Sequence, residues 1–180
     1  CDWNEQEIEL RRLRLLSKIC KKSFHRLQRL DFDYYGISQL RDAEMKTIIQ
    51  YMNGRLKNLR CLSINFRFNR DGVWASGRNM IPLLKSIKYN CASLIELKLS
   101  FQLVFYITGA EIQAFERLFA KIGTTLKYLD LDFSGSTRPM HEDEDANSFE
   151  SYFAEDLGRA IIKYLPKLES LRLNINDTFS

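Results

Sequence analysis

The sequence predicts an α/β protein built as a solenoid, in which short parallel strands alternate with helices in stacked units. Two observations predict this fold. A motif of alternating apolar residues occurs five times at a nearly constant step, and stretches of helical periodicity fall between the copies. We expect a curved parallel sheet on the concave side and helices on the convex side. With 180 residues, 45% of them hydrophobic, the chain can bury one such core.

The repeated motif reads L-x-x-L-x-apolar, with a further large apolar side chain two positions later. Its first two columns hold Leu in every copy, and successive copies lie 32, 35, 32 and 42 residues apart. The last step returns to 32 when an acidic insert near 137–146 is removed, and inserts in solenoids fall in loops. We therefore expect a basic helical cap over 1–26 and about five repeats over 27–180. The copies begin at Leu27, Leu59, Leu94, Leu126 and Leu168.

Helical periodicity separates the copies. Apolar residues within 112–122 recur at i, i+3, i+7 and i+10, which predicts an amphipathic helix. Thr108 is expected to cap its start and Gly123 its end. The range 45–52 carries a similar stripe and predicts another helix.

Two further helices complete the units. A long one is predicted over 149–164, opened by Ser148 and stopped by Pro166. A shorter one is predicted over 80–87, where Pro82 would lie in the first turn and its missing N–H does little harm. Because a single strand–helix unit cannot bury its apolar face alone, the units must stack on one another.

On these motifs the chain resembles the leucine-rich repeat family, and its long steps are most similar to the ribonuclease-inhibitor-like kind. The resemblance implies a full α-helix in each unit and partner binding on the concave face. The family often places Asn three residues after the last Leu of the motif, where it ties adjacent loops. Only the last of the corresponding residues matches: Tyr35, Arg67, Gln102, Ser134 and Asn176. Four copies instead carry Asp or Asn just after the motif, which suggests a related role in the turn: Asp33, Asn65, Asp132 and Asn174.

The residues between the apolar columns should point to the concave face, because strand side chains alternate. They are polar nearly throughout, and a merely solvated surface is the alternative to a binding site. Their mixed charges argue against a nucleic-acid groove, which needs an unbroken basic stripe, and favour a protein partner. The candidate binding residues are Arg29, Asp31, Asp33, Ser63, Asn65, Glu96, Lys98, Tyr128, Asp130, Asp132, Arg172 and Asn174.

The predicted N-terminal helix has a dense basic face. The simplest interpretation is a cap with a solvated outer side. A contact with RNA, an anionic lipid surface or an acidic protein is a second interpretation. The stretch Leu13–Phe24 also resembles the end of an F-box, which would make the chain the substrate-recognition part of a ubiquitin-ligase adaptor whose F-box lies mostly upstream. The basic residues are Arg11, Arg12, Arg14, Lys18, Lys21 and Lys22.

No pattern in the sequence predicts catalysis, a cofactor or a metal site. Nucleophile-elbow, phosphate-loop and dinucleotide-binding motifs are missing, and the acidic insert lacks the spacing of a calcium loop. The four cysteines have no metal-site spacing and are expected to be reduced and mostly buried. We therefore expect a non-catalytic scaffold or adaptor, a subunit of a larger assembly, in an intracellular and most simply cytoplasmic setting.

The two ends of the chain complete the prediction. No stretch is apolar enough to span a membrane, and no secretory signal is recognisable. The chain opens at Cys1 rather than Met, so we expect a fragment or a processed protein. The last predicted strand, Leu171–Ile175, would leave an edge open, and either further protein or a partner is expected to cover it.

Overall fold

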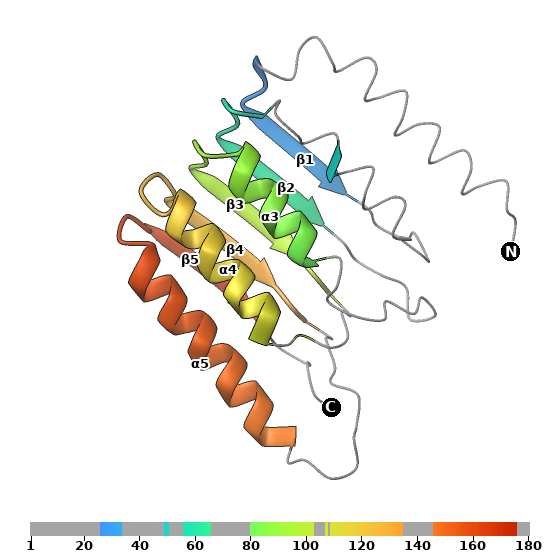
Figure 1. The fold of residues 1–180 in the computed structure, drawn as a ribbon, viewed down its shortest axis with the longest axis vertical. Helices are drawn as coiled ribbons and strands as arrows, with labels where there is room; N and C mark the ends of the chain where they lie inside the picture. The colour runs from blue at the N-terminus through green and yellow to red at the C-terminus, as the bar shows by residue number, and fades with distance from the viewer. Residues whose placement is uncertain are drawn as a thin grey trace, which may run out of the picture.

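The fold is α/β, as predicted. The computed structural model describes residues 26–33, 49–50, 56–65, 80–102, 107, 109–134 and 146–175, with side chains from 153 onward in the last range. Within these ranges it contains five strands and three helices (Figure 1). In chain order they are β1 (Arg29–Asp33), β2 (Cys61–Asn65), α3 (Met80–Asn90), β3 (Glu96–Ser100), α4 (Gly109–Ile122), β4 (Tyr128–Asp132), α5 (Ala146–Tyr164) and β5 (Ser170–Asn174).

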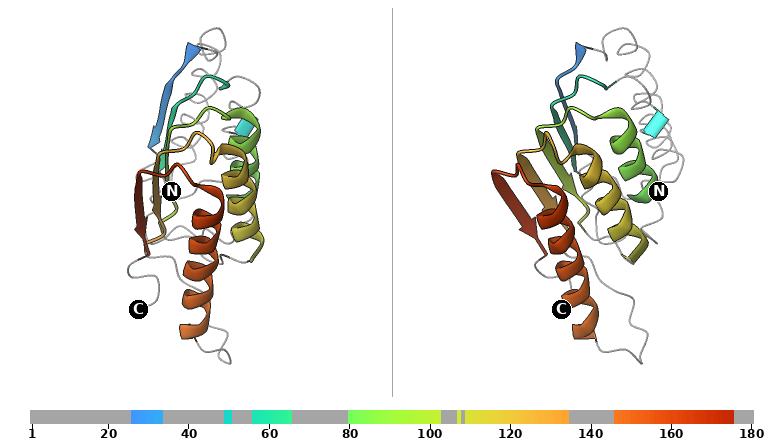
Figure 2. Two further views of the ribbon diagram at one scale, coloured as in Figure 1. Left: turned by 90° about the vertical axis from the view of Figure 1, so that its left-hand side faces the viewer. Right: turned by 60° about the vertical axis from the view of Figure 1, so that its left-hand side comes forward.

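The strands form one parallel sheet in the order β1-β2-β3-β4-β5, which is also their order in the chain. Helices α3, α4 and α5 lie side by side against one face of this sheet (Figure 2). The predicted alignment of the motif is confirmed by the register, because equivalent residues of successive copies are direct cross-strand partners. One apolar column runs through Leu30, Leu62, Leu97, Leu129 and Leu171.

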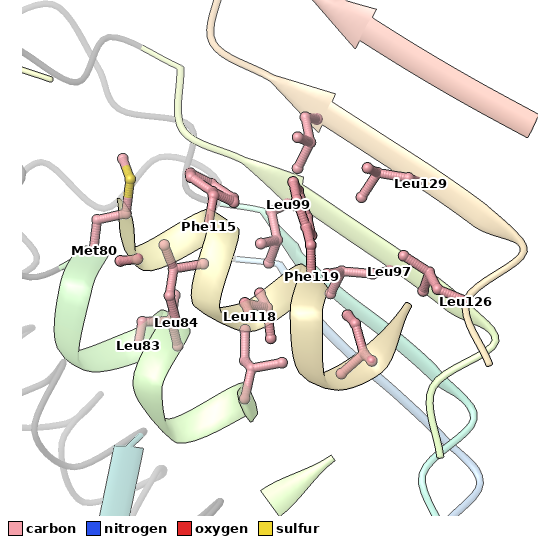
Figure 3. Close-up of a cluster of buried hydrophobic side chains, with 14 of the residues drawn as sticks. Met80, Leu83, Leu84, Leu97, Leu99, Phe115, Leu118, Phe119, Leu126 and Leu129 are labelled. Atoms are coloured by element: carbon pink, nitrogen blue, oxygen red, sulfur yellow. The ribbon is translucent and has the colours of Figure 1, made fainter. Parts of the chain in front are cut away.

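The core lies between the sheet and the helices (Figure 3). Leu97 and Leu99 of β3 are at most 1% exposed, and Leu118 and Phe119 of α4 are fully buried against them. Burying a side chain of this size contributes roughly 1.5–3 kcal/mol each, so the apolar columns supply the main driving force for stacking the units. The predicted stripe of α4 is confirmed as a buried face, and that of α5 is buried at its described residues except Tyr164, which is partly buried against the core.

A cluster of phenylalanines fixes the end of the core beyond the strands. Phe101 and Phe133, which follow β3 and β4, stack with their ring centroids 5.8 Å apart. Phe115 of α4 meets both rings edge-on, at 6.4 and 6.0 Å. Phe153 of α5 meets Phe133 edge-on at 5.1 Å. These contacts tie two strands to two helices, and such geometry stabilises beyond the area that it buries.

Three helix boundaries or caps differ in detail from the prediction. Helix α5 begins at Ala146, two residues before Ser148, and Ala is the residue that favours helix most strongly. Helix α3 continues past residue 87 to Asn90, whose side-chain amide donates to the carbonyl of Ser86 at 2.8 Å. Gly123 follows α4 as predicted but is not in the left-handed conformation; a Cβ there would overlap the carbonyl oxygen of Tyr164.

Several predictions lie outside the described residues. They concern the cap over 1–26 apart from Arg26, most of the helix at 45–52, Thr108, and the acidic insert apart from Ala146, which belongs to α5. Ile49, the described apolar residue of the second region, packs against the core. In the described ranges, no helix is both long and apolar enough to cross a bilayer.

Candidate functional site

The face of the sheet opposite the helices, here called the open face, presents the polar residues that alternate with the apolar columns. Register places them in three rows across the strands. All twelve predicted binding residues lie in these rows. The first row is Arg29, Cys61, Glu96, Tyr128 and Ser170; the second is Asp31, Ser63, Lys98, Asp130 and Arg172; the third is Asp33, Asn65, Ser100, Asp132 and Asn174.

On strands β1 to β3 the charged side chains of the first two rows satisfy one another. Arg29 lies 3.1 Å from Asp31 and 3.5 Å from Glu96, and Glu96 also accepts from Lys98 at 2.9 Å. The hydrogen bond from Lys98 is the main cause that lowers the pKa of Glu96, and the neighbouring Cys61 and Arg29 act in the same direction against partial burial. This part of the open face therefore forms a closed network with little unmatched charge.

The two described cysteines differ in environment. Cys91 is buried in the core, and that burial raises the pKa of its thiol to about 12. Cys61 is half-buried on the open face, where burial and a hydrogen bond with Glu96 raise its pKa. Both are free thiols. The prediction of a buried thiol is confirmed for Cys91, while Cys61 is only partly covered because nothing described packs above its row.

On strands β3 to β5 the open face is hollowed. A hollow of about 390 Å³ is lined by Glu96, Lys98, Tyr128, Leu129, Asp130, Ser170 and Arg172. Tyr128 is 44% exposed beside it. Among the described residues, the side chains of Asp130 and Arg172 make no hydrogen bond or ion pair. This part of the open face thus combines a recess, an exposed aromatic ring and two charges of opposite sign that form no ion pair with a described residue.

Two residues beside the hollow were not among the predicted binding residues. Lys127 and Glu169 occupy the same position of successive motifs, just before β4 and β5, and form an ion pair. Glu169 also accepts a hydrogen bond of 3.2 Å from the hydroxyl of Tyr128. The sequence carries a signal that could have identified this pair, because residues of opposite charge occupy the same motif position in successive copies. The contact holds the ring of Tyr128 at the edge of the hollow.

Side chains of the third row join neighbouring strands, and one of them, Asp132, also stabilises the turn after its strand. The side chain of Gln102, which follows β3, donates to the carboxylate of Asp132 in the next unit. Asp132 also accepts from the backbone amide of Ser134 at 3.0 Å. Asn65 donates to Asp33 across the first two strands at 3.2 Å. The predicted turn role is confirmed for Asp132, and Gln102 ties adjacent units from the position where the resembled family often has Asn.

The environment of Asp132 shifts its titration. Burial acts to raise the pKa of this carboxyl, but donors from Gln102 and Ser134, with the nearby charge of Arg172, outweigh burial and lower it. The residue is therefore held ionised by its hydrogen bonds, as expected of a structural carboxylate that accepts from backbone and amide groups.

Within the part of the chain that the structure describes, no three His, Cys, Asp or Glu side chains come together as they would around a metal ion. The six predicted basic-contact residues of the N-terminal segment and the Leu13–Phe24 stretch lie outside that part. No protein-family model, curated protein or solved structure matches the chain. The open face, with its hollow on β3 to β5, is therefore the candidate site that the geometry offers.

Proposed function

We propose that this chain is a leucine-rich repeat solenoid of the ribonuclease-inhibitor-like kind, and that it serves as a non-catalytic scaffold or adaptor. Its open face binds a protein partner within a larger intracellular assembly. The proposal is carried by one observation: beside Tyr128 at a hollow, Asp130 and Arg172 form no ion pair with any residue that the structure describes, whereas the charges of the first two rows on β1 to β3 pair with one another.

The chemistry of the hollow favours a protein over other ligands. Exposed Tyr and Arg are the residue types that most often carry binding energy at protein interfaces. A partner that brings an acidic side chain to Arg172 and a basic one to Asp130 would compensate both charges when water is removed. A polyanion would find no continuous basic surface there, because Glu96 and Asp130 alternate with Lys98 and Arg172 around the recess.

The repeat architecture supports the same proposal. Five copies of one motif are stacked in register, and the helix side is closed by apolar packing. The open face repeats polar positions that can vary without loss of the core. A surface of this kind is free to acquire specificity for a partner, since its side chains do not determine the fold.

The test compares two charge-exchanged variants of equal net charge. Asp130→Lys/Arg172→Glu alters the hollow, while Glu155→Lys/Arg159→Glu exchanges an exposed ion pair on the outer side of α5. Each protein is immobilised and exposed to native extract in mild salt, and retained proteins are quantified by mass spectrometry. We expect the partners held by the unaltered chain to fall at least about tenfold with the first variant and to persist with the second.

A third variant, Tyr128→Ala, separates shape from charge at the same site. It should weaken the same partners without changing net charge. If all three variants retain the partner set of the unaltered chain, the open face is not the binding site and the proposal fails.

A further inference from the structure

Strand β5 is the last strand of the described sheet, and one side of its backbone has no described neighbour. In a parallel sheet the N–H and C=O of one residue point to the same neighbouring strand, and successive residues alternate. Ser170 donates to Lys127 at 3.0 Å, and Asn174 accepts from Phe133 at 2.7 Å, so these residues face β4. The backbone groups of Leu171 and Leu173 therefore face outward.

The start of each strand follows one hydrogen-bond rule. The carbonyl just before a strand accepts from two consecutive amides of the next unit, at 2.7–3.0 Å. This occurs at all four interfaces between the described strands. The accepting carbonyls belong to Gln28, Arg60, Ile95 and Lys127. The equivalent residue of the fifth unit is Glu169, and its carbonyl is placed to accept two amides of a sixth strand.

The side chains of β5 also lack described neighbours on the side away from β4. Leu171 is 47% exposed, whereas its equivalents Leu129 and Leu97 are 2% and 0% exposed between neighbours. In the second row of the open face the charges alternate as Lys98, Asp130 and Arg172. An acidic residue would continue this alternation beside Arg172.

We propose that β5 binds a strand of a partner protein that runs parallel to it and carries an apolar–acidic–apolar sequence. The two apolar residues complete the columns of Leu171 and Leu173, and the acidic residue pairs with Arg172. Consecutive amides at the start of the partner strand donate to the carbonyl of Glu169. This interaction uses the backbone edge of β5, and Arg172 is the residue that it shares with the proposed binding on the open face.

A capped synthetic peptide that copies Leu27–Asp33 of this chain is a suitable probe, because it contains the apolar–acidic–apolar pattern. Binding is followed by NMR of the whole protein. We expect the amides of Leu171 and Leu173 to shift and to gain protection from exchange. N-methylation at Asp31 of the peptide, whose amide would face β5, should weaken binding about tenfold or more. N-methylation at Phe32, whose amide faces away, should leave it unchanged.

Two protein variants provide a matched control. Leu171→Lys places a charge at the edge and should abolish binding, while Ile162→Lys makes the same change at a site on α5 that is 83% exposed and should not. Tyr128→Ala should retain the peptide, which keeps this test independent of the open face.

Three results would overturn the proposal. The first is that the amide signals of Leu171 and Leu173 do not shift even at the highest peptide concentration that stays in solution. The second is that both N-methylated peptides bind with equal affinity. The third is concentration-dependent self-association that Leu171→Lys removes, measured by sedimentation, since it would assign the edge to a second copy of the chain.

Discussion

The two faces of the sheet are built from alternating residues of the same strands, yet they follow different rules. In β3 the side chains of Leu97 and Leu99 are at most 1% exposed, while Lys98 between them lies on the open face. The buried columns repeat almost one residue type from unit to unit, because each must fill the same space. The open-face rows change in charge and size at each step. The uniform buried columns therefore specify the fold, while the residues of the open-face rows can vary without changing it.

The open face is itself uneven. The charged side chains of the first two rows on β1 to β3 pair among themselves, whereas Asp130 and Arg172 beside the hollow form no ion pair within the described ranges. Exposed pairs of the first kind contribute little stability, with a median of about 0–1 kcal/mol. Their main effect is to remove unmatched charge from one half of the face, so the two charges without an ion pair among the described residues lie on the other half.

The largest difference in stability between buried-face and open-face variants should appear when the side chain of Phe133 is truncated. This ring is fully buried and contacts aromatic rings of β3, α4 and α5 units. Phe133→Ala should lower the free energy of unfolding by about 3–5 kcal/mol, because it leaves a cavity that the neighbours cannot fill. Urea denaturation measures the change.

The control for this prediction is Lys98→Ala on the open face. It should change the free energy of unfolding by no more than about 0.5 kcal/mol. Equal losses for the two variants would contradict the division of roles between the faces.

A smaller loss of stability is expected from a substitution at Gly123, where the end of α4 lies close to the end of α5. An added Cβ would meet the carbonyl oxygens of Tyr164 and Phe119. Gly123→Ala should therefore force the ends of α4 and α5 apart and destabilise the protein by roughly 1–3 kcal/mol. The midpoint of thermal unfolding, compared at fixed protein concentration, reports the change.

Gly158 in α5 offers the matched substitution. A Cβ there meets nothing within 4 Å. Gly158→Ala should stabilise the helix by about 0.5–1 kcal/mol, since Ala restricts the unfolded chain and favours helix. A Gly123→Ala variant as stable as Gly158→Ala would show that the close approach of the two helices is not required.

The smallest effect concerns pH and the open-face carboxylate Asp132. Its pKa in the folded protein lies below the value of 3.8 for an unperturbed group. The unfolded chain therefore takes up the proton first, so the stabilisation is fully present above about pH 4 and is lost as pH falls through the folded pKa. Asp132→Asn should lose less stability than the unaltered chain between pH 7 and pH 3, as measured by urea midpoints.

Gln102→Ala, which removes a donor to Asp132, should give an intermediate pH dependence. Glu96, whose pKa is also lowered, provides a second carboxylate for the same comparison. If Asp132→Asn follows the pH profile of the unaltered chain, the hydrogen bonds at this turn do not depend on the ionised form.

The sequence by itself determined the strands, their parallel order and the outward set of residues. Five copies of one alternating motif leave little freedom, because a shift of one residue would turn every Leu of a strand toward water. The same periodicity placed α3, α4 and α5 between the strands and identified their buried sides. The open-face rows followed directly, since they are the residues that remain.

Only the tertiary structure decided which open-face charges are paired and where the surface is hollowed. The contact between Arg29 and Glu96 reaches past β2, and the ion pair of Lys127 with Glu169 joins residues from two units. Local patterns cannot predict such contacts, because they depend on side-chain reach across stacked strands. The need for Gly123 arises in the same way, from the approach of a second helix. Periodicity sets which face a residue occupies, and packing between units sets what it meets there.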